Sequence, residues 1–363
     1  MTPDSIFAGA EERRKGSRYR EALKLYRKAF AEYSLVGDSD GKLQCLLSIG
    51  DTLRMTGDFK AAGSAYDEAA ALCRKKKDSL LLADSFVGLG LSKRALGFWK
   101  EALILFNKAQ KIYTKNSDKE GTAFALWAAG GAYRVKGDLK KAIGAFRDAK
   151  KIFSELGTPG ERMRGSGYCL CGLGGASRIA AGWEASMKYY TEANAIFRRL
   201  KDRFGTAYSH CGIGNAFRIK GDYGNALKHL NKAEQIYKSI GDIVSYSYTV
   251  WSLGMLHMMN SRLKTAEKYL SRAAALFAKT EDVRGSIYFK LATGELMFLR
   301  GEKKAAKRAA TEALRLSADK MFMLEQCHSE SLLNYINGVK NSSGCYKRLG
   351  SDLRFNAIPF NIP

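Results

Sequence analysis

The sequence predicts an all-α solenoid built from repeated helix–turn–helix units. A glycine in a helical context recurs every forty residues, apart from one interval of forty-four, at Gly50, Gly90, Gly130, Gly174, Gly214, Gly254 and Gly294. An alanine stands nineteen residues after each of these glycines, at Ala69, Ala109, Ala149, Ala193, Ala233, Ala273 and Ala313, and Ala29 begins that series. A fixed period of this length is typical of stacked structural repeats.

The composition agrees with one packed helical array. The chain has 363 residues, only 4 prolines and 46% hydrophobic residues, which favours a folded protein over a disordered one. Because each repeat contacts mainly its neighbours, we expect one elongated array and not two or three separate domains. Lysine and arginine outnumber aspartate and glutamate by 60 to 36, and the resulting charge of +24 favours acidic partners, phosphates or anionic surfaces.

The first helix of each unit has a buried stripe and a marked end. In the unit that begins near Gly41, the apolar residues Leu46, Ile49 and Leu53 recur at helical spacing. A glycine followed by an acidic residue then ends one helix and caps the next. This signal occurs at Gly57-Asp58, Gly137-Asp138, Gly221-Asp222 and Gly301-Glu302.

The second helix of each unit carries an alanine, a large residue and another alanine. Examples are Ala62, Tyr66 and Ala69, and Ala142, Phe146 and Ala149. Small residues let two helices approach, and the large residue fills the space between them.

Together the two helices resemble the tetratricopeptide repeat. The residues that carry the resemblance in the second unit are Leu46, Gly50, Leu53, Ala62, Tyr66 and Ala69, and the resemblance extends from about Asp4 to Gly338. It implies a right-handed superhelical solenoid of about eight repeats, with second helices that begin near Ser17, Gly57, Gly97, Gly137, Ala181, Gly221, Ser261 and Gly301. The forty-residue length is similar to the long repeats of kinesin light chain and Pins-type adaptors, which implies a binding protein without catalytic activity.

The ends of the array differ from its interior. We expect residues 1–338 to form the solenoid, with a capping helix near 321–337. The four inserted residues around Gly157 to Gly160 have the composition of a loop and lengthen a turn. Residues 339–363 lack the repeat, and two Ile-Pro pairs favour an extended carboxyl-terminal tail.

One face of the first helices has an unusual chemistry. Positions six before, three before, one after and four after the recurring glycine share an arc that lines the concave face in the resembled family. Five units place an arginine four residues after it, at Arg54, Arg94, Arg134, Arg178 and Arg218, and Arg14 stands in the same register in the first unit. The other candidate binding residues on this arc are Phe124, Trp127, Tyr168, Tyr208, Asn215, Tyr248 and Tyr288.

These residues favour a protein–protein interaction adaptor whose concave groove binds an acidic, extended peptide. Arginine can hold a carboxylate through two hydrogen bonds, and tyrosine adds apolar contact with a polar tip. Single-stranded nucleic acid is the alternative partner, because phosphates would meet the arginines and bases would stack on the rings. A scaffold that self-assembles through its tail is a third interpretation, and duplication of the repeat could account for the arginine line without any binding role.

The carboxyl-terminal part of the groove is apolar, as is the tail. The tail residues Phe355, Ile358, Pro359, Phe360 and Ile362 match a surface that includes adaptable methionines. That surface comprises Trp251, Met255, Met258, Met259, Leu291 and Phe298. We therefore expect the tail to dock there, in its own chain or in a neighbour.

Other kinds of site find no support in the sequence. The glycine-rich segment Gly172 to Gly175 lies inside a predicted helix, where a phosphate-binding loop does not occur. The four histidines are isolated and no nucleophile–base pattern stands out, so we expect no catalytic residues, no metal and no cofactor.

The location also follows from composition. Seven cysteines, an odd number without a disulfide-framework spacing, predict reduced thiols. The first sixteen residues lack the apolar core of a signal peptide, and no apolar run is long enough for a membrane span. We therefore predict a cytoplasmic protein without membrane insertion.

Overall fold

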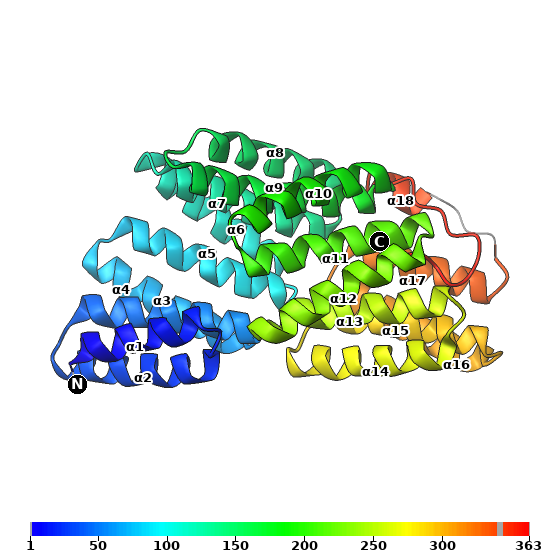
Figure 1. Cartoon of the computed structure of the whole chain (residues 1–363), viewed down its shortest axis with the longest axis horizontal. Coiled ribbons are helices and arrows are strands. Elements are labelled where there is room, and N and C mark those ends of the chain that lie inside the picture. Colours follow the sequence, from blue (N-terminus) through cyan, green and yellow to red (C-terminus); the bar gives the residue numbers. More distant parts are fainter. Residues whose placement is uncertain (1, 340–343, 363) are drawn as a thin grey trace.

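The computed structural model describes residues 2–339 and 344–362, and within these ranges it contains helices and no strand. Successive helices pack in antiparallel pairs that wind into a superhelix (Figure 1). The first helices of the units are α1 (Pro3–Lys15), α3 (Ser39–Thr56), α5 (Ser79–Ala95), α7 (Lys119–Lys136), α9 (Pro159–Ile179), α11 (Arg203–Lys220), α13 (Ile243–Met259) and α15 (Val283–Leu299). The second helices are α2 (Tyr19–Leu35), α4 (Phe59–Lys76), α6 (Trp99–Lys115), α8 (Leu139–Ser154), α10 (Trp183–Arg199), α12 (Tyr223–Ile240), α14 (Leu263–Lys279) and α16 (Lys303–Asp319). The predicted all-α solenoid of about eight units is confirmed.

The predicted helix boundaries follow from local chemistry. Gly57 ends α3 with a left-handed backbone at a φ of 83°, which costs least for glycine. The side chain of Asp58 then accepts a hydrogen bond from the backbone N–H of Ala61 and caps α4. Aspartates also cap most of the first helices, at Asp38, Asp78, Asp118, Asp202, Asp242 and Asp282.

The recurring glycines make room for the large residues of the second helices. A Cβ atom added to Gly50 would lie 2.7 Å from Cζ of Tyr66, and one added to Gly130 would lie 2.8 Å from Cε1 of Phe146. Both rings are buried. The forty-residue period is therefore a packing requirement, since any side chain at the glycine would displace a core ring.

The superhelix is tighter than the sequence suggests, because units about five positions apart along the array touch each other. Helix α3 packs near α13, and α7 packs near α17 (Met323–Ile336). The indole N–H of Trp99 donates to the carbonyl of Lys320 at 3.2 Å, and Lys60 pairs with Glu281 at 2.5 Å. Each unit still contacts mainly its neighbours, as expected, and these additional contacts join units that are far apart in the sequence.

The expectation that the inserted residues lengthen a turn is wrong, because they mainly extend helix α9, which has 21 residues where α7 and α11 have 18. Between α8 and α9, Thr158 and Glu161 form a reciprocal capping box that starts the longer helix α9. Helix α17 covers the end of the array by packing on α16 and α15. Beyond it, the tail contains a short helix, α18 (Gly344–Arg348), followed by residues without regular structure.

The prediction that all cysteines are reduced is wrong. Cys327 on α17 and Cys345 on α18 form a disulfide, with their Cα atoms 5.7 Å apart. They lie eighteen positions apart in sequence and come together because the tail folds back over the cap. The other five cysteines are free. No described helix has the length and apolarity needed to span a bilayer.

Candidate functional site

The six arginines of the line lie near the ends of α1, α3, α5, α7, α9 and α11. The next first helix makes room for two of the guanidinium groups. A Cβ atom added to Gly131 would lie 2.2 Å from Nη1 of Arg94, and one added to Gly175 would lie 2.3 Å from Nη1 of Arg134. Gly131 and Gly175, each one residue after a recurring glycine, therefore leave the space that the guanidinium groups of Arg94 and Arg134 occupy.

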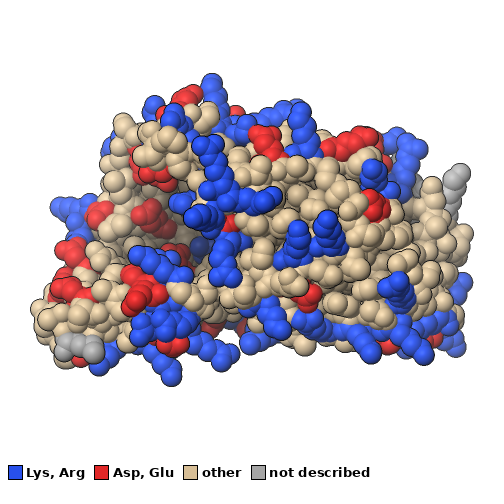
Figure 2. All heavy atoms as spheres, viewed as in Figure 1, with Lys and Arg blue, Asp and Glu red and all other residues tan. Residues whose placement is uncertain are grey.

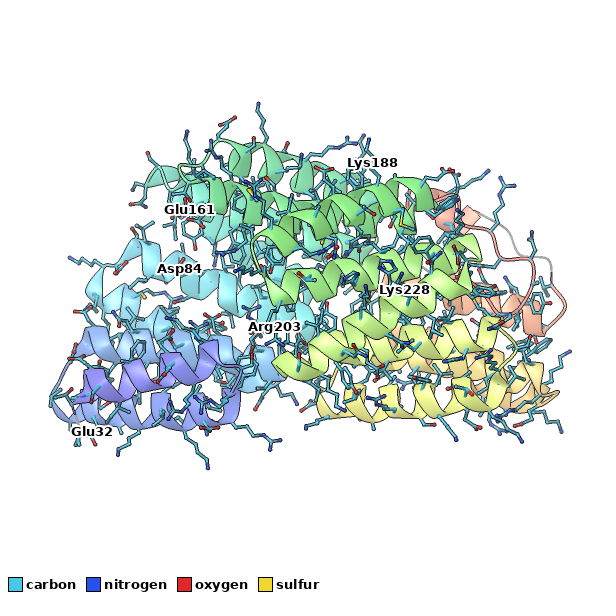
Figure 3. All side chains as sticks on the ribbon, viewed as in Figure 1. Glu32, Asp84, Glu161, Lys188, Arg203 and Lys228 are labelled. Atoms are coloured by element: carbon cyan, nitrogen blue, oxygen red, sulfur yellow. A yellow bond between two sulfur atoms is a disulfide. The ribbon has the colours of Figure 1, made fainter. Side chains whose placement is uncertain are left out.

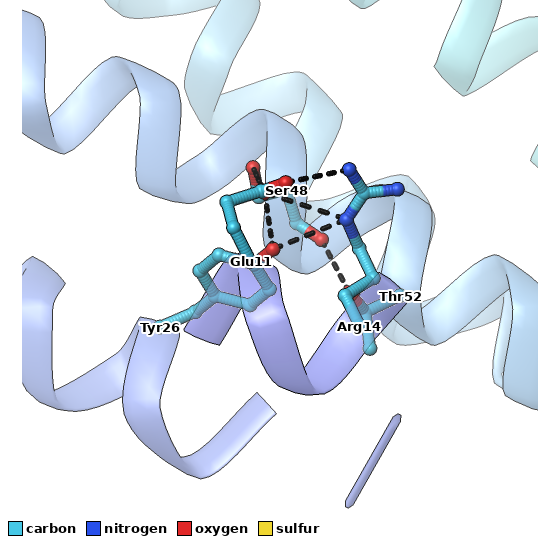
Figure 4. A network of polar contacts seen from close by, with 5 residues as sticks. All are labelled: Glu11, Arg14, Tyr26, Ser48 and Thr52. Atoms are coloured by element: carbon cyan, nitrogen blue, oxygen red, sulfur yellow. Dashed lines mark hydrogen bonds and ion pairs between the residues drawn. The ribbon is translucent and has the colours of Figure 1, made fainter. Parts of the chain in front are cut away.

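The first two arginines are neutralised within their own helices. Arg14 pairs with Glu11 at 2.7 Å, and the hydroxyl of Tyr26 donates to the same carboxylate (Figure 4). The hydrogen bond to Glu11 raises the pKa of Arg14 above its usual range. Arg54 repeats this arrangement with Asp51 at 3.4 Å. Because the acid stands three residues before the arginine, a carboxylate ligand would have to compete with it.

The next three arginines have no carboxylate partner among the described residues. In their units the position three residues before the arginine holds Leu91, Gly131 or Gly175. Arg94 makes one long contact, 3.5 Å to a backbone carbonyl, and the Nε atom of Arg178 is buried without a hydrogen-bond partner. The side chain of Arg134 has no hydrogen bond or ion pair within the described ranges.

Burial raises the free energy of holding these three positive charges close together. The pKa of Arg94 is lowered to about 10, first because the group is buried and then because Arg134 and Arg54 lie nearby. A group of like charges that protein carboxylates do not balance favours an anionic ligand. We name Arg94, Arg134 and Arg178 the arginine cluster.

The sixth arginine is occupied by the tail. Arg218 is fully buried, and its guanidinium donates to Oδ1 of Asn361 at 2.6 Å and to the carbonyl of Ile362 at 2.7 Å. The side chain of Asn361 returns hydrogen bonds to the carbonyls of Arg218 and Ile219. Burial lowers the pKa of Arg218 to about 9. This arginine is therefore not free to meet another ligand while the tail is in place.

The apolar surface expected to receive the tail lies beneath it. Trp251, Met255, Met258 and Leu291 belong to the same buried cluster as Phe355, Phe360 and Ile362, with Phe298 at its border. The sulfur of Met259 lies 3.8 Å from Nη1 of Arg218. The tail that is docked here is the chain's own.

Sequence reasoning missed Glu295, the other polar group that contacts the tail. Its fully buried carboxylate accepts a hydrogen bond from the backbone N–H of Phe360 at 2.8 Å. Burial raises the pKa of Glu295 well above its usual range. The signal in the sequence was a single acid, one residue after a recurring glycine, among apolar neighbours.

The aromatic residues mostly join one unit to the next. Trp127 donates to the carbonyl of Tyr168 at 3.2 Å, and the hydroxyl of Tyr168 donates to Asp202 at 3.0 Å. The hydroxyl of Tyr288 donates to Glu325 in the same way. Phe124 stacks on Trp127 with ring centroids 5.5 Å apart, and at 38% exposure it is the most open ring of the set.

The remaining candidates are also held by neighbours. Tyr208 packs against Phe204, and Tyr248 packs edge-on against Tyr288. The amide of Asn215 donates to the hydroxyl of Ser252 at 3.1 Å and accepts from Arg218. Stacking of a ligand on these side chains is therefore limited mainly to Phe124.

The face shown in Figure 2 is hollowed and bears both acidic and basic atoms around the hollow. Figure 3 labels Asp84 on α5 and Arg203 on α11 in this part of the molecule. Burial raises the pKa of Asp84, and Asp118 and Asp51 add to the effect, although a hydrogen bond from Tyr113 opposes it. Acids such as Asp51 and Asp84 thus lie toward the amino-terminal end of the concave face, the arginine cluster in its middle and the tail toward its other end.

The described residues contain no group of three or more histidine, cysteine or acidic side chains arranged for a metal. The expectation that all histidines are isolated is wrong, since the Nδ1 atoms of His210 and His229 lie 3.0 Å apart. His328 is also paired, with the hydroxyl of Tyr346 at 2.9 Å. Neighbouring helices bring these pairs together in a way that their sequence spacing does not reveal.

Comparison with known proteins agrees with the fold. Residues 12–75 and 81–155 match the family model of the tetratricopeptide repeat. No curated protein sequence matches the chain.

Solved structures with the same fold are remote in sequence. A Rap protein complexed with competence and sporulation factor has 14% identity and a TM-score of 0.59, and the match covers 93% of this chain and 97% of that one. The Rap conjugation gene regulator of plasmid pLS20, in complex with the Phr* peptide, has 14% identity and a TM-score of 0.63 over 76% and 73%. Aspartyl phosphate phosphatase F from Bacillus subtilis has 13% identity and a TM-score of 0.50 over 98% and 97%. At these identities the likeness concerns the fold alone.

Proposed function

We propose that this chain, whose residues 12–75 and 81–155 match the family model of the tetratricopeptide repeat, is a non-catalytic adaptor that binds an acidic, extended peptide of a partner protein. The site is the arginine cluster of Arg94, Arg134 and Arg178. The observation that carries this proposal is the contrast along the line, in which Arg14 and Arg54 have carboxylate partners and the next three arginines have none.

Carboxylates would complete the cluster chemically. A guanidinium offers parallel donors to a carboxylate, and such charge-assisted bonds are about twice as strong as neutral ones. First helices of neighbouring units lie roughly 8 to 10 Å apart, and an extended peptide advances about 3.3 Å per residue. An acidic group at every third ligand residue would therefore meet successive arginines.

Other features support a peptide over a nucleic acid. Bases need exposed rings for stacking, and only Phe124 among the candidate aromatics is clearly exposed. The solved structure of the pLS20 regulator holds a peptide on the same fold. We also propose that the protein needs no metal or cofactor and acts in the cytoplasm, where the Cys327–Cys345 pair would face thiol reductants.

A pull-down distinguishes the two partner classes. The bait is the whole chain, and the test variant carries Arg134→Gln and Arg178→Gln. The control carries Arg147→Gln and Arg199→Gln, which remove the same charge from exposed positions on α8 and α10. We expect the test variant alone to lose a protein band that nuclease treatment leaves unchanged. A band that disappears with nuclease, or that both variants lose equally, would contradict the proposal.

A further inference from the structure

The end of the tail is held on the concave face through its backbone. Glu295 accepts the N–H of Phe360, and Arg218 donates to the carbonyl of Ile362. Phe360 and Ile362 are at most 1% exposed, and Phe360 stacks on Phe355 with centroids 4.9 Å apart. This part of the concave face is therefore a site for an extended peptide, and the chain's own tail fills it.

The charge of the tail does not match the site. Residues Leu353 to Ile362 contain no acidic side chain, and Arg354 is basic. The guanidinium of Arg218 receives two neutral oxygens, from Asn361 and Ile362. A carboxylate in the same place would form a charge-assisted bond and balance a buried positive charge. The tail is held by apolar burial and tethering, and an acidic ligand would bind Arg218 itself more strongly.

The tail also lies in the path of the proposed ligand. Arg218 follows Arg178 in the line, one first helix further along. The pKa of Arg218 is lowered first by burial and then by the positive charge of Arg178, which shows that the two groups are near each other. A peptide that follows the arginine cluster with an acid at every third residue would reach Arg218 with its next acid. At that point it meets Asn361 and Ile362.

We propose that residues 355–362 are an internal competitor that limits the acidic ligand to three arginines, and that a ligand with a fourth acidic position must displace the tail from Arg218. This inference rests on the proposed function. A tethered segment has a high effective concentration, so the competition costs a long ligand much of the affinity that its fourth acid would add.

The experiment compares two peptides on two proteins by titration calorimetry. The short peptide carries three acidic residues at every third position, and the long one carries four. The proteins are the whole chain and a variant that lacks residues 353–363. We expect the deletion to tighten binding of the long peptide at least tenfold and to change binding of the short one by less than twofold. A synthetic peptide of residues 353–363 should bind the deleted protein and compete with the long peptide alone.

The outcomes separate the two proposals. If neither peptide binds either protein, the proposed function is wrong. If the short peptide binds but the long one gains nothing from the deletion, or the tail peptide does not bind, the competitor is wrong.

A second pair of variants tests the proposal without the deletion, in case the shortened protein does not fold. In the whole chain, Asn361→Ala removes the side-chain hydrogen bond from Arg218 and the two bonds to the carbonyls of Arg218 and Ile219. It keeps the bond from Arg218 to the carbonyl of Ile362, the disulfide and the apolar contacts, so it should tighten binding of the long peptide several-fold. Asn356→Ala, an exposed tail position, is the matched control and should have no effect. Equal affinities for both variants and the unaltered chain would overturn the proposal.

Discussion

The guanidinium of Arg134 lies against the backbone of Gly175, where a Cβ atom would come within 2.3 Å of Nη1. The absence of a side chain at 175 thus sets the position of an arginine on the preceding first helix. The same relationship holds between Arg94 and Gly131. The arginine cluster is therefore built by two sequence features together, an arginine in one unit and a glycine in the next.

Gly175→Ala should weaken binding of the acidic peptide without destabilising the fold. The added methyl group moves the guanidinium of Arg134, whose far end is flexible, and lies 3.2 Å from the hydroxyl of Tyr190, a small crowding that is offset because alanine favours the helix by about 1 kcal/mol. We expect binding several-fold weaker by calorimetry, with an unchanged or higher melting temperature. Gly144→Ala on α8, where a Cβ atom meets nothing within 4 Å, is the control and should leave binding unchanged. Equal affinity for both variants would argue against this account of the site.

Single Arg→Gln substitutions should affect binding unequally along the line. Each member of the arginine cluster should cost about 1 to 3 kcal/mol of binding free energy, because it bonds directly to a charged ligand. Arg14→Gln and Arg54→Gln should cost about 0.5 kcal/mol or less, since Glu11 and Asp51 already pair with these residues. Calorimetry with the short peptide measures all five. A uniform effect at every position would contradict the division into paired and unpaired arginines.

Reduction of the disulfide should lower the stability of the chain. The Cys327–Cys345 bond closes a loop of eighteen residues, for which the constraint on the unfolded state is about 3 kcal/mol. We expect a lower free energy of unfolding in urea when dithiothreitol is present. The variant with both cysteines replaced by serine should be equally unstable with and without reductant, and a reductant effect on that variant would point to another cause.

A fall in pH should lower the free energy of unfolding, partly because His328 has a lowered pKa in the folded state. This side chain is fully buried, and burial followed by repulsion from Arg284 lowers its pKa from 6.5 to about 3. A histidine with a depressed pKa favours folding above pH 6.5, and the contribution is lost as the pH falls, because only the unfolded state takes up the proton. Between pH 7 and 5 the loss should be about 2 kcal/mol. Urea unfolding at both pH values should show a smaller loss for His328→Gln, and an identical loss would exclude His328 as the cause.

The sequence contained the local features of the fold, because they depend on residues close along the chain. The spacing of Gly50 and Tyr66 predicted a pair of close-packed helices, and Gly57-Asp58 predicted the boundary between them. The closure of the superhelix was not predictable in this way. The contact of Trp99 with Lys320 results from small rotations added over several units, and no single repeat encodes their sum.

The site was predictable only in part for the same reason. The arginine line was visible, and Glu11 and Asp51 stood three residues before Arg14 and Arg54 in the sequence. The burial of Glu295 and the pairing of Cys327 with Cys345 depend on where the tail folds back, which periodicity does not describe.

The central claim is that the unpaired arginines bind carboxylates, and one titration tests it most directly. The short acidic peptide is titrated into the whole chain, into the Arg134→Gln/Arg178→Gln variant and into the Arg147→Gln/Arg199→Gln control. We predict saturable binding to the whole chain and to the control, with at least a tenfold loss for the cluster variant, and no binding of a peptide whose acids are replaced by their amides. Equal binding of the acidic peptide to all three proteins would contradict the account.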